Sequence, residues 1–386
     1  MKRIFYLTRT LPVKNTGGAV IRRGSIRYLK ENGFMVIVVA PSLITEKRDD
    51  RILVKGLQSK LDIKWNMLKF KMGWNNDYMT SWVNKAYRIL KSELTKDDIV
   101  VATSGGELGT LMLASKLKKS VGCRVVYNLH DPIDFTIIEG DFTYQNNYNI
   151  KSRDNVECAV FSEADMIVTS SGYYAEALKK KYPQYAAKIG CHHFGYIEKY
   201  AHPQTEMLQN KRLNIVYGGN MGRLQGPEIL IDVAKEIPQI QFTMIGNVTF
   251  AQEEMPPNVQ ILPLMTHEEY LKYLCENADI GFFSLVSGKA NYGIVSKLCV
   301  PSKLYEYINI GLPIIAAVEG DAKSIINKNG YGIATSYDVE SLVTAVNSLT
   351  QPNVLSAAKN RVVKDREKWF MGNTIQELIG AINDVH

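Results

Sequence analysis

The stretch "LNIVYGGNMGRLQGPEIL" (residues 213–230) predicts a strand, a glycine-rich loop and the start of a helix. Its opening run is mostly apolar and β-branched, which is typical of a buried strand. Four glycines follow within nine residues, and apolar residues resume at helical spacing after Pro227. A strand that passes through a glycine-rich loop into a helix is the opening unit of a Rossmann-like domain.

The same alternation continues on both sides of this stretch. Helical patterns separate the later apolar runs "IQFTMIG" (240–246), "NVQILPL" (258–264), "ADIGFFSLV" (278–286), "PIIAAV" (313–318) and "GIATS" (332–336). They also separate the earlier runs "RIFYLT" (3–8), "MVIVVAP" (35–41), "DIVVATS" (98–104), "RVVYNLH" (124–130) and "ADMIVTSS" (164–171). Strands alternating with helices predict parallel sheets covered on both faces. We therefore expect an α/β protein of two Rossmann-like domains, with the boundary near residues 200–212.

Composition agrees with a globular protein of two domains. The 386 residues are 46% apolar and 22% charged, and no apolar run approaches the roughly 20 residues that span a bilayer. The apolar stretch at the start is too short for a signal peptide, so we expect a cytoplasmic protein. The five cysteines are scattered without a CxxC pair, which favours reduced core residues over disulfides or a zinc site.

The net charge of +7 is concentrated in residues 55–96, which hold nine Lys or Arg, three acids and three of the four tryptophans. Basic residues interleaved with Trp suit an anionic membrane surface. The alternative is a solvated helical face whose aromatic residues pack inward. Nucleic acid is not expected as a partner, because no recognition motif accompanies the charge.

Two glycine-containing loops could bind an anion. Gly17 and Gly18 follow the first strand and open a helix, where backbone amides can approach an anion, although glycine also makes plain turns. This loop lacks the GxGxxG spacing of a dinucleotide site. In the second domain the guanidinium of Arg223 could bind phosphate oxygens, or it could pair with Glu228.

The stretch "PSKLYEYINIGLPIIAA" (301–317) predicts a helix with Ser302 as its N-cap and Gly311 at its end. Lys303 then lies in the first turn, where the helix dipole disfavours a cation, and a bound diphosphate would explain it. Glu306 follows on the same face and could accept hydrogen bonds from a ribose diol. An ion pair between Lys303 and Glu306 is the alternative.

These residues resemble a known family. The sequence "GGNMGRLQG", then "PSKLYEYINIGLPIIA" and "NKNGYGIA", is similar to the nucleotide-binding half of retaining GT-B glycosyltransferases of family GT4, in the bacterial branch that builds O-antigen and capsular polysaccharides. The resemblance covers nearly the whole chain. It implies an acceptor domain (1–205), a nucleotide-sugar donor domain (206–365) and a last helix (366–386) that crosses back to the first domain.

The resemblance also implies an activity and a set of site residues. A sugar would pass from a nucleoside diphosphate sugar to a lipid-linked saccharide acceptor on the inner face of the plasma membrane, with retained configuration. The catalytic residues would be His130, Arg223 and Lys303. The donor would be bound by Gly17, Gly18, Gly219, Asn220, Arg223, Ser302, Lys303, Leu304 and Glu306.

This sequence departs from the family's pattern at three positions. Leu298 stands where the first acid of the E-x7-E motif falls, and Glu306 matches the second. Asn220 and Gln225 occupy positions where an arginine and a lysine are common. These changes leave open a catalytically silent nucleotide-sugar-binding subunit, and a GT-B type epimerase is a further alternative.

We expect no metal and no other cofactor. The acidic pairs at 49–50 and 97–98 are better explained as solvated turns than as a metal-binding motif. Cationic side chains and helix amides can stabilise a departing diphosphate without a metal. Hydrolysis would usually need two carboxylates across the scissile bond, and the expected cleft motifs offer only Glu306, with Asp131 and Asp134 near His130. His130 itself could merely cap a turn. The neighbouring histidines at 192 and 193 lack a third ligand nearby and read as structural.

Overall fold

The computed structural model describes residues 2–11, 17–133, 147–208, 212–219, 221–222, 224–247, 255–286 and 293–384. Its contacts divide the chain into two compact units. The first holds residues 1–197 and 374–386, and the second holds residues 198–373. The sequence places the corresponding boundaries at 205/206 and 365/366. Residues after 197 join the second unit because Glu198 and Gln204 bond to helix α11 (Ser302–Ile310), through Asn309 and the carbonyl of Ile310.

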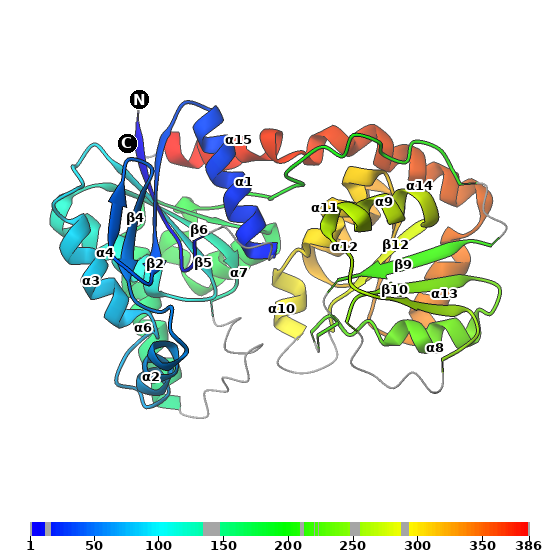
Figure 1. Cartoon of the computed structure of the whole chain (residues 1–386), viewed down its shortest axis with the longest axis horizontal. Coiled ribbons are helices and arrows are strands. Elements are labelled where there is room, and N and C mark those ends of the chain that lie inside the picture. The colour runs from blue at the N-terminus through cyan, green and yellow to red at the C-terminus, as the bar shows by residue number, and fades with distance from the viewer. Residues whose placement is uncertain are drawn as a thin grey trace. The chain divides into compact units, whose positions relative to one another are not determined.

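The first unit is a mostly parallel sheet of eight strands in the order β3-β4-β2-β1-β5-β6-β7-β8. Helices cover both faces (Figure 1). The strands are β1 (Arg3–Leu7), β2 (Met35–Ser42), β3 (Glu46–Arg48), β4 (Arg51–Lys55), β5 (Ile99–Gly105), β6 (Arg124–Asp131), β7 (Met166–Thr169) and β8 (Ile189–Cys191). The helices are α1 (Gly17–Glu31), α2 (Lys60–Lys71), α3 (Thr80–Leu90), α4 (Gly109–Val121), α6 (Asn147–Ser162), α7 (Gly172–Lys181), the 3-10 helix η1 (Pro183–Lys188) and α15 (Met371–Asn383).

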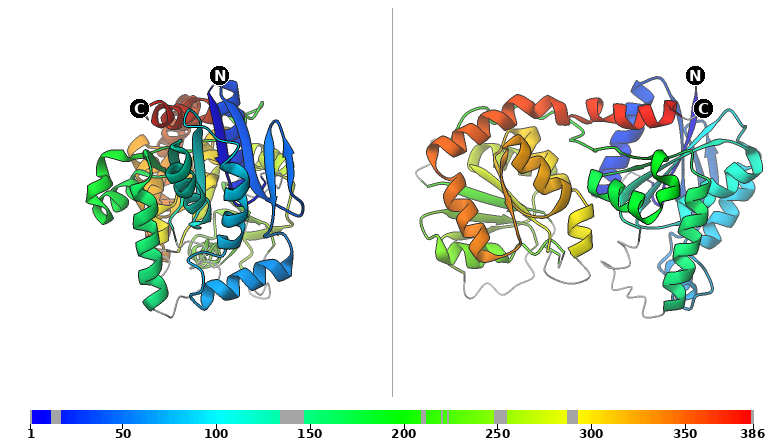
Figure 2. Two further views of the ribbon diagram at one scale, coloured as in Figure 1. Left: turned by 90° about the vertical axis from the view of Figure 1, so that its left-hand side faces the viewer. Right: turned by 180° about the vertical axis from the view of Figure 1, so that it is seen from behind.

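The second unit is a fully parallel sheet of six strands in the order β11-β10-β9-β12-β13-β14. Views from the side and from behind again show helices on both faces (Figure 2). The strands are β9 (Asn214–Gly218), β10 (Gln241–Ile245), β11 (Val259–Leu262), β12 (Ile280–Ser284), β13 (Ile314–Ala317) and β14 (Gly332–Thr335). Besides α11, the helices are α8 (Ile229–Glu236), α9 (His267–Asn277), α10 (Gly293–Leu298), α12 (Gly320–Asn329), α13 (Val339–Leu349), α14 (Pro352–Asp365) and the 3-10 helix η2 (Arg366–Trp369).

All eleven predicted strands are present. The sequence missed β3, β4 and β8. Strand β3 is short and charged and pairs only at the edge of the sheet, antiparallel to β4, so it lacks the apolar run of a central strand. Strand β8, "IGC", is three residues long.

Helix α15 packs on the first unit. Thr374 donates to the carbonyl of Phe194, Gln376 to Asn32, and Lys2 to Asn383. The last two bonds join the helix to segments more than 300 residues away along the chain. The C-terminal segment therefore completes the layer of helices over the N-terminal strands.

The sheet orders indicate where ligands bind. In each sheet the strand order reverses direction beside the first strand, between β1 and β5 in one unit and between β9 and β12 in the other. Open parallel sheets bind ligands outside the carboxyl ends of the strands at such a point. The loops after β1, β5, β9 and β12 are therefore the places to search for a site.

Candidate functional site

The loop after β9 requires glycine at two successive positions. A Cβ at Gly218 would lie 2.2 Å from the ring of Tyr270, so only glycine fits against this buried tyrosine. Gly219 has a φ of +117°, a left-handed conformation that L side chains rarely adopt. The backbone here consequently runs directly over a buried aromatic ring.

Three tyrosines form a floor beneath this loop. Tyr217, Tyr270 and Tyr307 are all buried, and the hydroxyls of Tyr270 and Tyr307 lie 3.4 Å apart. Tyr307 donates to the carbonyl of Phe282 in β12 at 2.8 Å. The floor thus joins β9, α9, α11 and β12 at the carboxyl edge of the sheet.

Lys303 lies on this floor and against the glycine loop. Its Nζ is 5.1 Å from the ring centroid of Tyr217, and a Cβ at Gly219 would be 3.1 Å from the same Nζ. The structure therefore brings the first turn of α11 to the loop after β9, although 84 residues separate them. Burial lowers the pKa of the Lys303 ammonium, while the charge of Glu306 acts in the opposite direction.

No described carboxylate forms an ion pair with Lys303. The alternative of a local pair with Glu306 is wrong for this conformation, because Glu306 faces His267 instead: Nε2 and Oε1 lie 3.7 Å apart. Lys303 is thus a partly buried cation whose ion-pair partner is missing among the described side chains. A bound anion would supply that partner.

The contact of Glu306 with His267 is a feature the sequence analysis missed. His267 is the first residue of α9, after the N-cap Thr266 and its capping box with Glu269. The Glu306 carboxylate that faces the ring raises the pKa of His267, although burial acts in the opposite direction. The sequence did carry a signal for this contact. The stretch "THEEY" predicts a helix that starts at Thr266, so His267, like Lys303, falls in the first turn of a helix, where a positive charge is disfavoured.

The start of α11 differs from the prediction by one residue. Pro301 is the N-cap and Ser302 is the first helical residue, so Ser302 caps nothing. Proline fits because its extended conformation leads into the helix and no N–H is needed there. Leu304 has a fully buried side chain, and its N–H donates to the carbonyl of Pro301, so it offers a ligand no free donor from this amide.

Two expected ligand residues of the loop, Asn220 and Arg223, lie outside the described residues. Around them the loop is held to β12: the N–H of Val286 donates to the carbonyl of Leu224 at 2.8 Å, and Ser284 donates to that of Gln225. The side-chain Oε1 of Gln225 is buried without a described hydrogen-bond partner.

Leu298, at the position of the missing acid, ends helix α10 and is partly buried. The backbone of α10 is close to the start of α12, because a Cβ at Gly320 would lie 1.9 Å from the carbonyl oxygen of Lys297.

In the first unit, a cluster of charged side chains surrounds Gly105 at the end of β5. A Cβ at Gly105 would lie 3.3 Å from Arg22, 3.4 Å from Asp131 and 3.6 Å from Glu107. Glu107 is fully buried; it accepts from the N–H of Gly105 at 3.0 Å and from Arg9 at 3.4 Å. The charge of Glu107 raises the pKa of Arg9.

Arg22 connects this cluster to the expected glycine loop. Helix α1 starts at Gly17, and a Cβ at Gly18 would lie 3.6 Å from Nη1 of Arg22. Arg22 is buried and its Nε has no described hydrogen-bond partner. The side chains of Arg9, Arg22 and Glu107 were missed by the sequence analysis, because they become neighbours only through the strand order β1-β5-β6.

His130 lies at the carboxyl end of β6 and is buried, with neither ring nitrogen hydrogen-bonded to a described residue. Burial, then the charges of Arg22 and His192, hold its pKa well below the usual value, so its imidazole is neutral at pH 7. Its ring packs edge-on against Phe194 at a centroid distance of 4.7 Å. It therefore packs as a core side chain, and it keeps two unused polar atoms.

Two further buried side chains near His130 also lack described partners. The ring of His192 packs edge-on against Phe194 at a centroid distance of 5.6 Å, and burial lowers the pKa of His192 to about 4. Asn128, two residues before His130 in β6, has neither its amide nitrogen nor its oxygen bonded. Buried polar atoms are normally satisfied by protein, water or ligand, so these side chains keep unused hydrogen-bonding capacity near the carboxyl ends of β6 and β8.

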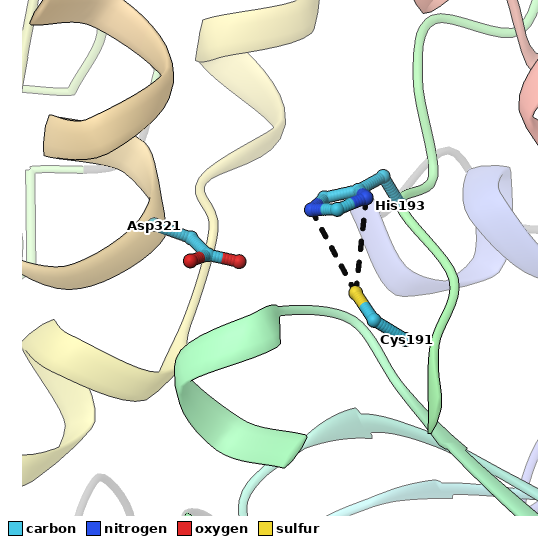
Figure 3. Close-up of side chains that lie close together, drawn as sticks. All are labelled: Cys191, His193 and Asp321. Atoms are coloured by element: carbon cyan, nitrogen blue, oxygen red, sulfur yellow. Dashed lines mark hydrogen bonds between the residues drawn. The ribbon is translucent and has the colours of Figure 1, made fainter. Parts of the chain in front are cut away.

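The side chain of His193 contacts Cys191 and Glu377. The sulfur of Cys191 lies 3.7 Å from both ring nitrogens of His193 (Figure 3), and Glu377 of α15 is 3.6 Å from Nδ1. The backbone N–H of His193 also donates to Glu377 at 2.7 Å. Asp321, which is drawn in the same view, belongs to the second unit. These contacts hold α15 to the first unit.

Similar arrangements occur in solved structures over the full length of the chain. Sucrose-phosphate synthase from Thermosynechococcus elongatus matches with a TM-score of 0.72 and 14% identity, covering 99% of this chain and 98% of that one. The lipopolysaccharide outer core galactosyltransferase WaaB matches with a TM-score of 0.68 and 13% identity over 99% of both chains. The chain has the GT-B fold. This confirms the predicted fold class of two Rossmann-like α/β domains.

A third GT-B structure is that of Anabaena HepE, solved in complex with UDP-glucose, with a TM-score of 0.64 and 13% identity over 99% of this chain and 100% of that one. At these identities the likeness establishes the fold alone. No protein-family model matches the sequence, and no curated protein matches it.

Proposed function

We propose that this protein is a retaining glycosyltransferase of the GT4 kind that transfers a sugar from a nucleoside diphosphate sugar to a lipid-linked saccharide. The observation that carries the proposal is Lys303, a partly buried cation beside the glycine loop after β9, without a described carboxylate partner. A diphosphate is the anion that this position suits, because the first turn of α11 adds amides and the positive end of its dipole.

The proposal assigns each part of the donor to named residues. Lys303 and the amide end of α11 would neutralise the diphosphate, and Glu306 would accept hydrogen bonds from the ribose diol. His267, whose Nε2 lies 3.7 Å from Oε1 of Glu306, would hold that carboxylate in position. Arg223, Asn220 and Gly219 would complete the phosphate site from the loop.

The chemistry needs charge stabilisation more than acid–base catalysis. As the bond from the anomeric carbon to the phosphate oxygen breaks, its electron pair stays on the diphosphate and positive charge develops on the sugar. Cations already in place stabilise the departing charge without reorganisation. We propose that this removes the need for a metal ion. Neutral His130 can exchange hydrogen bonds with the sugar near the reacting carbon.

The acceptor and the location are part of the proposal. WaaB, which shares the fold, is named as a lipopolysaccharide outer core galactosyltransferase. A lipid-linked acceptor, an attachment to the inner face of the plasma membrane and a role in O-antigen or capsule synthesis agree with that likeness and with the basic, Trp-rich residues 55–96.

The test is turnover. Purified protein would be incubated with UDP-, GDP- and dTDP-sugars and a lipid-linked saccharide, with EDTA present, and the product linkage read by NMR. Retained anomeric configuration and release of the nucleoside diphosphate support the proposal. Release of an epimerised sugar nucleotide would assign an epimerase, and binding without turnover on any acceptor would assign a silent nucleotide-sugar-binding subunit.

A further inference from the structure

Helix α2 carries apolar residues on the side that faces solvent. Leu61 is 80% exposed, Trp65 52% and Leu68 45%. At 100° per residue these three positions lie within a 60° sector of the helix surface, one above the other. They form a continuous outward stripe, which we call the α2 stripe.

The opposite side of α2 is the one packed on the protein. Its buried residues are Asn66 and Phe70, which lie 100° or more around the helix from the α2 stripe. Asn66 donates to the carbonyl and carboxylate of Asp62 and accepts from Ser81. Helix α2 is therefore fixed by its inner face, and the exposure of its outer face is a property of the folded chain.

Lysines line both edges of the α2 stripe. Lys60, Lys64 and Lys71 are exposed and lie along one edge, and Lys69 lies along the other, with its ammonium 5.1 Å from the ring of Trp65. The helix has one acid, Asp62, and its carboxylate already accepts from the N–H of Leu57 at 2.6 Å. The outward face therefore combines large apolar side chains with a net positive charge.

Neighbouring segments extend this face. Met72 and Trp74, just after the helix, are 52% and 61% exposed. Before it, Leu43 and Ile44 are 68% and 61% exposed on the β2–β3 connection. That connection is tied to the segment leading into α2, because the N–H of Gly56 donates to the carbonyl of Ser42 at 2.9 Å. Figure 1 shows α2 beyond the ends of the strands of its unit, on the same side as this connection.

We propose that α2 lies in the surface of an anionic membrane, with the α2 stripe in the acyl boundary and its lysines at the lipid phosphates. A helix with apolar and aromatic residues on one face and lysines at the edges has the chemistry of an interfacial helix, and the lysines favour anionic over zwitterionic lipid. None of the helices in the described part of the chain has the length and apolar content that a bilayer span requires.

This inference rests on the proposed function only for its purpose, which is to bring a lipid-linked acceptor to the enzyme. The position of α2 assigns the first unit, the one proposed to bind the acceptor, as the part that meets the lipid. Vesicle binding by the folded chain needs neither donor nor turnover, so its outcome is independent of the activity.

The test is partition of the full chain onto vesicles of phosphatidylcholine with and without phosphatidylglycerol, by co-sedimentation and by the blue shift of tryptophan emission. We expect binding to anionic vesicles at low salt that weakens as salt is added. Reversing Lys60 and Lys64 to Glu should weaken it by about 25-fold or more, at roughly fivefold for each lysine charge. Trp65→Ala with Leu68→Ala should weaken it at least about tenfold and remove most of the blue shift.

Matched controls use the second unit. Lys328→Glu with Lys364→Glu makes the same charge change on exposed lysines, and Leu264→Ala with Val354→Ala removes exposed apolar side chains. Both controls should bind vesicles nearly as the wild type does. Circular dichroism and UDP affinity establish that each variant is folded.

Three results would overturn the inference: no binding of the wild type to anionic vesicles, equal binding to zwitterionic vesicles, or equal losses in the α2 variants and the controls. Self-association without lipid that Trp65→Ala with Leu68→Ala abolishes would assign the α2 stripe to a second copy of the chain, and so would also overturn it. Vesicle binding without glycosyl transfer would leave the inference standing and remove the proposed function.

Discussion

Replacing Lys303 by methionine separates a ligand-binding cation from a structural one. Methionine retains a chain of similar length over the ring of Tyr217 and removes only the charge. In the wild-type chain this ammonium is partly buried, burial lowers its pKa, and no described carboxylate pairs with it. The charge therefore costs stability in the free protein and is useful only when an anion is bound.

The two effects have opposite signs. Loss of a charge-assisted hydrogen bond costs about 1.5–3 kcal/mol, so the Kd for UDP or the matching nucleoside diphosphate should rise roughly 10- to 150-fold. The free energy of unfolding of the free protein should stay the same or rise by about 1 kcal/mol, because the variant no longer buries an unpaired cation.

Calorimetric titration gives the affinity, and urea unfolding without nucleotide gives the stability. Lys328→Met, which removes an exposed lysine at the far end of α12, is the matched control and should change neither. Unchanged affinity in Lys303→Met would refute the site. A loss of stability without nucleotide would show that Lys303 is held by the protein itself and would refute the reasoning from its missing partner.

Three further predictions concern the neighbours of the site. Glu306→Gln should weaken nucleotide binding by about 1–3 kcal/mol. Because it removes the carboxylate that faces His267, it should also lower the pKa of His267, which NMR titration measures. An unchanged His267 pKa would show that the contact between Glu306 and His267 is absent in solution. His192 has a folded pKa near 4 and an unfolded value near 6.5, so the unfolded chain binds more protons between these pH values and stability falls as the pH drops through them. Compared with His192→Asn, the wild type should lose roughly 3 kcal/mol more stability between pH 7 and pH 4 in urea titrations; parallel curves would contradict the buried neutral ring. Glu107→Gln removes one charge of the pair with Arg9 and should destabilise the first unit by about 1–3 kcal/mol in thermal unfolding, whereas an unchanged midpoint would mean that water already satisfies Arg9.

The sequence predicted the central strands because each carries a buried apolar run, and it predicted Gly311 as the end of α11 because a left-handed residue there favours glycine. The sequence could predict that Lys303 binds an anion, because a cation in the first turn of a helix is otherwise disfavoured. Its geometry could not, because 84 residues separate Lys303 from Gly219 and only the strand order brings them together.

The residues that the sequence analysis missed share one property: their partners are distant along the chain. Glu306 and His267 are 39 residues apart, and Arg9 and Glu107 are 98 apart. The assignment of Ser302 as the N-cap failed for a local reason, since proline and serine both suit a helix start and either could occupy the cap. The sequence could not show which apolar residues of α2 face solvent. Apolar residues occur on two opposite faces of this helix, so their spacing does not indicate which face packs on the protein.

The most direct test of the central claim is a thermal-shift screen of the full chain against UDP, GDP, dTDP, CMP and NAD, with and without EDTA. We expect one nucleoside diphosphate to raise the unfolding midpoint equally in both conditions, since a ligand at 100 times its Kd adds about 2.7 kcal/mol, and we expect Lys303→Met to lose the shift. Stabilisation by NAD alone, or by no nucleotide at all, would contradict the assignment of a nucleotide-sugar site to the carboxyl edge of the second sheet.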